Sequence, residues 1–126
     1  MIHWMNPRTA SFLPLIERDL QQVRAMLRDL ANELDEPIRP LVEYSALDRG
    51  KLLRPILLLL SGGTFGAIGP DHLYVATILE IVHNATLLHD DVLDGGVVRR
   101  GAPTVNRRWG NRVAVQVGDV LLGKVF

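Results

Sequence analysis

The chain has 126 residues, of which 48% are hydrophobic, and its 14 basic side chains balance its 14 acidic ones. That length fits one domain or part of one, and the composition excludes an intrinsically disordered chain. A net charge of zero gives no reason to expect binding to nucleic acid or to an anionic membrane, and the absence of cysteine excludes a disulfide framework and a thiolate metal site.

Two features bear on where the protein acts. Residues Met1 to Pro7 contain no basic region followed by an apolar run, so we expect no secretory signal. The longest apolar run, Pro55 to Leu60, is far shorter than the roughly 20 residues that cross a bilayer. We therefore expect a soluble protein without a transmembrane segment, and the lack of cysteine is compatible with a cytoplasmic location.

The first predicted element is an amphipathic helix over residues 11–36. Its apolar side chains recur at spacings of three and four residues, which is typical of one helical face: Leu13, Ile16, Leu20, Val23, Leu27, Leu30 and Leu34. Pro37 and Pro40 are expected to end this helix. The stripe favours packing inside the protein's own bundle over a coiled-coil dimer, because the repeat lasts only about three heptads.

Three more helices are predicted along the rest of the chain. The segment 51–61 is apolar on nearly every side and is expected to be buried. A glycine-rich connection leads to a long helix over 71–94, which two glycines terminate. After a basic loop, the last helix covers 111–126 and is still running where the sequence ends. Because helical periods dominate and no convincing strand is apparent, the predicted class is all-α.

An acidic cluster lies in the last turn of the 71–94 helix. Asp90 and Asp94 are four residues apart and share one face, while Asp91 lies about 100° around the axis. Their like charges repel at the negative end of the helix dipole, and a hard cation such as Mg²⁺ relieves that repulsion. An acidic helix end facing water is the plainer alternative. His83, on the same face as Asp90, favours a functional site.

Basic side chains flank this cluster along the sequence. Lys51 and Arg54 are three residues apart at the start of a leucine-rich helix, where the helix dipole attracts anions, and together they indicate a diphosphate pocket. Arg99 and Arg100 follow the acidic cluster and offer bidentate forks to phosphate. Solvated cations in a first helical turn and in a surface loop are the alternatives.

These motifs occur together in a fixed order. In sequence they are Gly50-Lys51-Leu52-Leu53-Arg54-Pro55, the run from His83 to Asp94, Arg99-Arg100-Gly101, Trp109-Gly110 and Val117-Gly118-Asp119. From Gly50 to Phe126 the chain resembles the trans-polyprenyl diphosphate synthases. The resemblance implies a helical bundle of the isoprenoid-synthase type, with residues 1–126 as the N-terminal part of a single domain.

The resemblance also implies a reaction and residue roles. Isopentenyl diphosphate would condense with an allylic diphosphate in isoprenoid biosynthesis, in a Mg²⁺-dependent prenyltransferase that forms homodimers. Asp90 and Asp94 would bind Mg²⁺, and Asp91 would support them in the catalytic cluster. Arg99 would hold the allylic diphosphate. Isopentenyl diphosphate would be held by four basic side chains: Lys51, Arg54, His83 and Arg100.

Three details of the chain carry further expectations. Leu52 stands where many family members have Arg, which is expected to weaken the binding of isopentenyl diphosphate without removing it. The second Asp-rich motif of the family does not occur in the 126 residues, so we expect little or no prenyltransferase activity from this chain alone. The small Ala85, five residues before Asp90, is expected to point into the substrate cavity and to favour geranylgeranyl or longer products.

Two other functions stay open on the sequence. A non-catalytic or regulatory subunit would dock on an intact synthase through apolar faces that the missing helices leave uncovered. A terpene cyclase also uses an Asp-rich Mg²⁺ site. The pair of Lys51 and Arg54 and the Arg99-Arg100-Gly101 motif argue against a cyclase, because a cyclase binds no second diphosphate.

Overall fold

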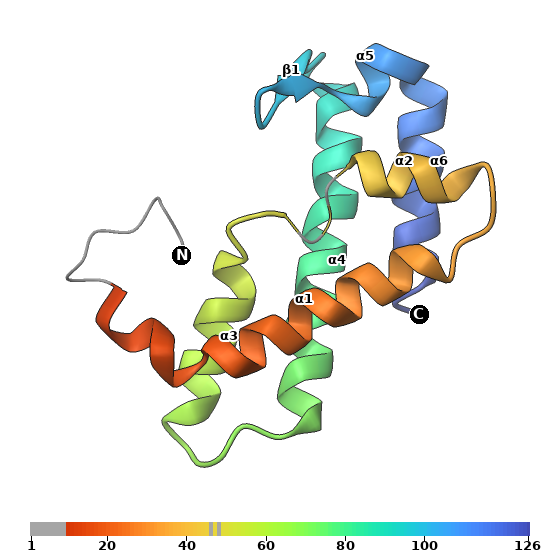
Figure 1. Ribbon diagram of the computed structural model, residues 1–126. Helices are drawn as coiled ribbons and strands as arrows, with labels where there is room; N and C mark the ends of the chain where they lie inside the picture. Colours follow the sequence, from red (N-terminus) through yellow and green to blue (C-terminus); the bar gives the residue numbers. More distant parts are fainter. Residues whose placement is uncertain (1–9, 46, 48) are drawn as a thin grey trace.

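The computed structural model describes residues 10–45, 47 and 49–126, which form helices and one small hairpin (Figure 1). In chain order the helices of this described part are η1 (Ala10–Leu15, a 3-10 helix), α1 (Glu17–Asn32), α2 (Ile38–Tyr44), α3 (Leu53–Gly63), α4 (Pro70–Leu93), α5 (Val105–Trp109) and α6 (Asn111–Gly123). The hairpin pairs β1 (Val98–Arg99) with β2 (Ala102–Pro103) in antiparallel register. The predicted all-α class is confirmed, since each strand has only two residues.

The long helix α4 is the centre of the fold and packs against α1, α3, α5 and α6. In Figure 1, α1 crosses α4, α3 lies beside its first half, and α6 lies beside the half that ends at the hairpin. The apolar stripe of α1 faces this centre, with Leu20, Val23 and Leu27 buried. Helices α3, α4 and α6 supply most of the remaining core: Ile56, Leu59, Ala76, Ile81, Ala85, Leu88, Ala114, Val117 and Leu121. The stripe therefore packs within its own bundle.

The single helix expected over 11–36 is wrong, because the segment is divided. Pro14 lies inside the 3-10 helix η1, and the chain turns at Ile16 before α1 begins at Glu17. A proline has no N–H to donate and its ring crowds the preceding turn, so a continuous α-helix through this point is disfavoured. At the other end α1 stops at Asn32, ahead of Pro37. Residues 1–9, where no secretory signal was expected, lie outside the described part.

Three short elements were not expected from the sequence. Helix α2 contains Pro40, which is tolerated because the N–H groups of a first turn have no helical partner. The hairpin turns at Arg100 and Gly101, both with positive φ, as tight two-residue turns require. Helix α5 is capped by Thr104, whose Oγ1 accepts a hydrogen bond from the Arg107 N–H at 3.3 Å.

The predicted helix over 51–61, which corresponds to α3, is only partly buried. Leu59 is completely buried, but Leu53 and Leu57 on the other side of α3 are 44% and 65% exposed. Helices α1 and α4 cover one face of α3, and no other described helix covers the opposite face. The leucine-rich sequence thus leaves an apolar face in contact with water. Within the described residues, none of the helices combines the length and apolar character needed to cross a bilayer.

Candidate functional site: a basic cavity beside the acidic end of α4

A cavity of about 470 Å³ lies between the start of α3, the middle of α4 and the hairpin, and we call it the basic cavity. It is lined by all five basic side chains that the sequence assigned to substrate binding: Lys51, Arg54, His83, Arg99 and Arg100. They come from three segments that are separate in the sequence, so only the packing of α3 and the hairpin against α4 brings them together. Their contact with substrate is not tested by the fold itself and stays a prediction.

An unusual backbone conformation occurs at two points of the basic cavity, at Leu52 next to Lys51 and at Arg100. Leu52, just before α3, and Arg100, in the hairpin turn, each have a φ of 52°, which is unusual for a residue with a side chain. No other described residue except glycine has a positive φ. The left-handed turn places the Leu52 side chain in the core, where it is 1% exposed, between the exposed residues Lys51 and Leu53. Such strained conformations cost on the order of 1 kcal/mol each and cluster at functional sites.

The electrostatics of the cavity favour an anion. Burial lowers the pKa of His83, and the guanidinium groups of Arg54, Arg100 and Arg99 lower it further. The imidazole is therefore biased toward its neutral form, first by burial and then by a positive potential. An anion in the cavity would oppose that potential, so the clustering of these cations is typical of a phosphate-binding site.

Glu80 is, besides Arg49, a charged member of this cavity that the sequence did not assign to the site. Its side chain is buried, with the residue 2% exposed, and burial raises its pKa. A hydrogen bond from Asn84 and the charges of Arg54, Arg100 and Arg24 act in the opposite direction. The available signal was a Glu among the apolar positions of the 71–94 segment, three residues before His83.

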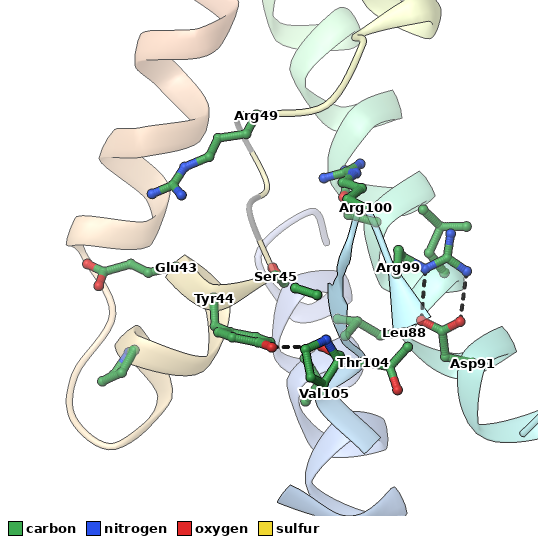
Figure 2. A pocket seen from close by; sticks show the side chains of 15 residues that line it. Glu43, Tyr44, Ser45, Arg49, Leu88, Asp91, Arg99, Arg100, Thr104 and Val105 are labelled. Atoms are coloured by element: carbon green, nitrogen blue, oxygen red, sulfur yellow. Dashed lines mark hydrogen bonds and ion pairs between the residues drawn. The ribbon is translucent and has the colours of Figure 1, made fainter. Parts of the chain in front are cut away.

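At the end of α4, Asp91 and Arg99 form a bidentate ion pair (Figure 2). Arg99 donates from Nε to Oδ2 of Asp91 and from Nη2 to Oδ1, both at 2.8 Å. These hydrogen bonds raise the pKa of Arg99, and the Asp91 side chain is only 11% exposed. Asp91 therefore orients an arginine of the basic cavity, a contact that the sequence did not suggest.

The turn after α4 is built to fit this ion pair. A Cβ on Gly96 would lie 2.7 Å from Oδ1 of Asp91, so only glycine fits there without a shift. The Gly96 carbonyl accepts hydrogen bonds from Oγ1 of Thr104 at 2.8 Å and from Nδ2 of Asn106 at 3.0 Å. The start of α5 thus holds the turn, and the turn holds the hairpin that carries Arg99 and Arg100.

Asp90 and Asp94 lie apart from the basic cavity. Asp90 lies in the last turn of α4 and Asp94 directly follows the helix; both are exposed, and neither lines the cavity that contains His83. Throughout residues 10–45, 47 and 49–126, no three His, Asp or Glu side chains group closely enough to hold a metal ion. The acidic end of α4 therefore offers two exposed carboxylates, Asp90 and Asp94, while the third, Asp91, is bonded to Arg99.

A larger cavity of about 660 Å³, shown in Figure 2, adjoins the basic cavity. Arg99 and Arg100 line both cavities, so the hairpin forms a shared wall. Tyr44 of α2 fixes this wall by donating from its hydroxyl to the carbonyl of Pro103 at 2.7 Å. Its ring also meets Trp109 edge-on at 4.7 Å, and Arg108 lies over both rings.

The expectation that Ala85 points into a cavity is wrong. Ala85 is completely buried in the core and lines neither the basic cavity nor the larger one. At this point α6 packs closely on α4, because a Cβ on Gly118 would lie 3.2 Å from the carbonyl oxygen of Ala85. The size of Ala85 therefore gives no structural ground for an argument about product length.

With this geometry in hand, comparison with known proteins gives a consistent answer. The polyprenyl synthetase family matches residues 35–126. The chain is 36% identical over 112 residues to octaprenyl diphosphate synthase of Escherichia coli, covering 89% of this chain and 35% of that protein. It is 41% identical over 101 residues to heptaprenyl diphosphate synthase component 2 of Bacillus subtilis, covering 74% of this chain and 29% of the relative.

A solved structure agrees with the sequence comparison. Polyprenyl synthase of Caulobacter crescentus, complexed with calcium and isoprenyl diphosphate, superposes with a TM-score of 0.80 at 34% identity, covering 91% of this chain and 35% of that one. The chain thus spans about a third of the length of the relatives it matches. It belongs to the polyprenyl synthetase family.

Proposed function

We propose that this chain carries the diphosphate-binding part of an isoprenyl diphosphate synthase, which condenses isopentenyl diphosphate with an allylic diphosphate. The observation that supports this most is the basic cavity itself. Six basic side chains line one cavity in a chain whose net charge is zero: Arg49, Lys51, Arg54, His83, Arg99 and Arg100. Such a local concentration of positive charge attracts anions, and a diphosphate has the matching charge.

The residues divide between two anions in this proposal. Isopentenyl diphosphate is held by four basic side chains that line the basic cavity: Lys51, Arg54, His83 and Arg100. Arg99 holds the allylic diphosphate with the N–H groups that Asp91 leaves unused. As the allylic carbon–oxygen bond breaks, the departing diphosphate gains charge, and a preoriented guanidinium stabilises it without having to reorganise.

The acidic end of α4 suits a magnesium ion in one respect. Asp90 and Asp94 present two exposed carboxylates one helical turn apart, and Mg²⁺ accepts one or two carboxylates while keeping its other positions for water and phosphate oxygens. When bound there, Mg²⁺ would supply charge neutralisation for the leaving diphosphate. In the same proposal Asp91 acts on Arg99 and is not a metal ligand.

Calorimetric titration with inorganic diphosphate and Mg²⁺ tests the site directly. We expect the wild-type chain to bind, and Arg54→Ala to bind at least about tenfold more weakly, because a charge-assisted contact is lost. Arg112→Ala, which removes an exposed arginine from the start of α6, is the matched control and should bind as the wild type does. Equal losses in both variants would contradict the assignment.

Turnover is a separate question, because the chain spans only about a third of its relatives. We expect little or no product from this chain with Mg²⁺, isopentenyl diphosphate and a labelled allylic diphosphate. Robust product formation would show that the segment needs no further helices. We also propose, from the family likeness, a cytoplasmic location and a homodimer for the intact enzyme.

A non-catalytic subunit is the second candidate, and an exposed apolar face favours it. On α3 and α4, Leu57, Tyr74 and Val75 are 65%, 59% and 46% exposed. One relative is named as component 2 of its synthase, which is the name of one part of an enzyme. Co-purification of an intact synthase with this chain, identified by mass spectrometry, would support the subunit; its absence together with diphosphate binding would favour the enzyme.

A further inference from the structure

Glu80 lines the basic cavity without the contacts that normally satisfy a buried carboxylate. Asn84 donates to its Oε1 at 3.3 Å, which is long, and its Oε2 accepts no hydrogen bond from any described residue. Asp91, by contrast, accepts two hydrogen bonds of 2.8 Å from Arg99. A buried oxygen without a partner needs an explanation, and a ligand that completes the site is one. Glu80 therefore lacks the pair of short hydrogen bonds by which Asp91 orients an arginine.

Charged groups reach Glu80 from each neighbouring element. Arg24 of α1, Arg54 of α3 and Arg100 of the hairpin all lower its pKa, and burial outweighs them. On α4 itself, His83 and Asn84 are the polar neighbours, and Lys51 lines the same cavity. A Cβ on Gly50 would lie 2.9 Å from Nη2 of Arg100 and 3.4 Å from Oε1 of Glu80, so both groups meet beside Gly50.

An anion in the cavity changes this balance in one direction. A diphosphate cancels the positive potential of Arg54 and Arg100, which is what favours ionised Glu80. It also repels a carboxylate directly, so the pKa of Glu80 rises further when the cavity is filled. The neutral acid carries an O–H donor that the carboxylate lacks, and phosphate oxygens are acceptors. An acid kept neutral by its surroundings is known to serve as such a donor.

We propose that Glu80 is a further diphosphate-binding group of the basic cavity, which as the neutral carboxylic acid donates its O–H to an oxygen of the bound anion. This role rests on the proposed function, since it needs a diphosphate in that cavity. The proton comes from solvent as the anion enters and returns to solvent as the anion leaves. No covalent bond between protein and ligand forms or breaks.

Proton uptake on binding tests this role. Titration of the whole chain with inorganic diphosphate, in two buffers of different ionisation enthalpy, measures the protons taken up. At about pH 7, Glu80→Gln is expected to take up fewer protons than the wild type, by roughly one at most. Its affinity should stay within about threefold, because the amide N–H replaces the O–H. Glu80→Met, which has no donor, should bind about tenfold more weakly.

Controls isolate the contribution of Glu80. The protons of diphosphate itself cancel when variants are compared, and His83→Gln measures the uptake that belongs to His83. Glu33→Gln removes an exposed carboxylate and should change neither affinity nor proton uptake. Circular dichroism confirms that each variant is folded; if Glu80→Met does not fold, the proton count of Glu80→Gln decides alone.

The outcomes separate this inference from the proposed function. Intact binding with unchanged proton uptake in Glu80→Gln would overturn the role of Glu80 only. A large loss of affinity in Glu80→Gln would also overturn it, because that result requires an ionised carboxylate. If the wild-type chain binds no diphosphate at all, the proposed function and the role of Glu80 both fail.

Discussion

Two buried carboxylates on the same helix meet arginines in different ways. Asp91, at the end of α4, makes two hydrogen bonds of 2.8 Å to Arg99 and is held by a tight glycine turn. Glu80, about three turns earlier, lies among Arg24, Arg54 and Arg100 with one oxygen unbonded. Both carboxylate oxygens of Asp91 accept hydrogen bonds from within the protein, whereas Oε2 of Glu80 accepts none from the described residues. A site prepared for a ligand is expected to look like the second.

The largest expected effect separates Asp91 from its acidic neighbours. Asp91→Ala removes both bonds to Arg99 and should lower the free energy of unfolding by about 2 kcal/mol, because the pair is bidentate and the Asp91 carboxylate is only 11% exposed. Asp94→Ala makes the same change at an exposed position and should cost less than about 0.5 kcal/mol. Urea denaturation measures both. Equal costs would mean that the ion pair is not what holds this end of the site.

Alanine substitutions at Gly96, beside Asp91, and at Gly50, beside Glu80, compare how much steric crowding each site tolerates. Gly96→Ala brings a Cβ within 2.7 Å of Oδ1 and 3.4 Å of Cα of Asp91, and should cost about 1 to 2 kcal/mol because that carboxylate is held in place. Gly50→Ala meets the flexible end of Arg100 at 2.9 Å and should cost less than about 0.5 kcal/mol. Thermal or urea unfolding distinguishes them, and the reverse order would show that the Glu80 end is the rigid one.

A smaller effect concerns the stability of Glu80→Gln at different pH. The pKa of folded Glu80 is raised above 4.5, so the wild type loses stability as the pH rises through that folded value. The glutamine does not titrate. The variant should therefore unfold at a higher urea concentration than the wild type at neutral pH, and the two should converge below pH 4.5. A variant that is less stable at neutral pH would show that the arginines depend on an ionised Glu80.

The smallest expected effect belongs to His83. Its pKa in the folded protein is lowered below 6.5, so stability is fully present above that pH and is lost as the pH falls toward the folded value. His83→Gln should flatten the dependence of the urea midpoint on pH between about pH 7.5 and about pH 5.5. If the urea midpoint of His83→Gln depends on pH as that of the wild type does, another titrating group causes the dependence.

Local sequence patterns indicated the main helices, apart from the break at Ile16, and five basic side chains of the basic cavity, but not Arg49 or Glu80. The stripe of Leu20, Val23 and Leu27 indicated the buried face of α1, because side chains three and four residues apart share a helical face. Motif order along the chain singled out Lys51, Arg54 and the two arginines after the acidic cluster. Segments shorter than about two helical turns, such as α2 and α5, escaped because they are too short to show a period.

Contacts between segments that are distant in the sequence could not be predicted from local patterns. The charge of Asp91 was evident, but its partner depends on how the hairpin folds back over α4. Glu80 resembled any other charged residue of a long helix until the packing of α1 and α3 showed that it is buried. The exposed side of α3 was misjudged for the same reason, since a leucine-rich helix is buried only where a neighbour covers it.

The sequence by itself determined the helical class, the family likeness and five of the cations that line the basic cavity, because these follow from residue type, period and order. Tertiary structure alone decided which carboxylate is bonded and which is left incomplete. Burial and hydrogen bonding depend on how segments pack against one another. Hydrogen-bond partners that are far apart in the chain produce no periodic pattern in the sequence. The contrast between Asp91 and Glu80 therefore belongs to the fold, although both residues were present in the sequence.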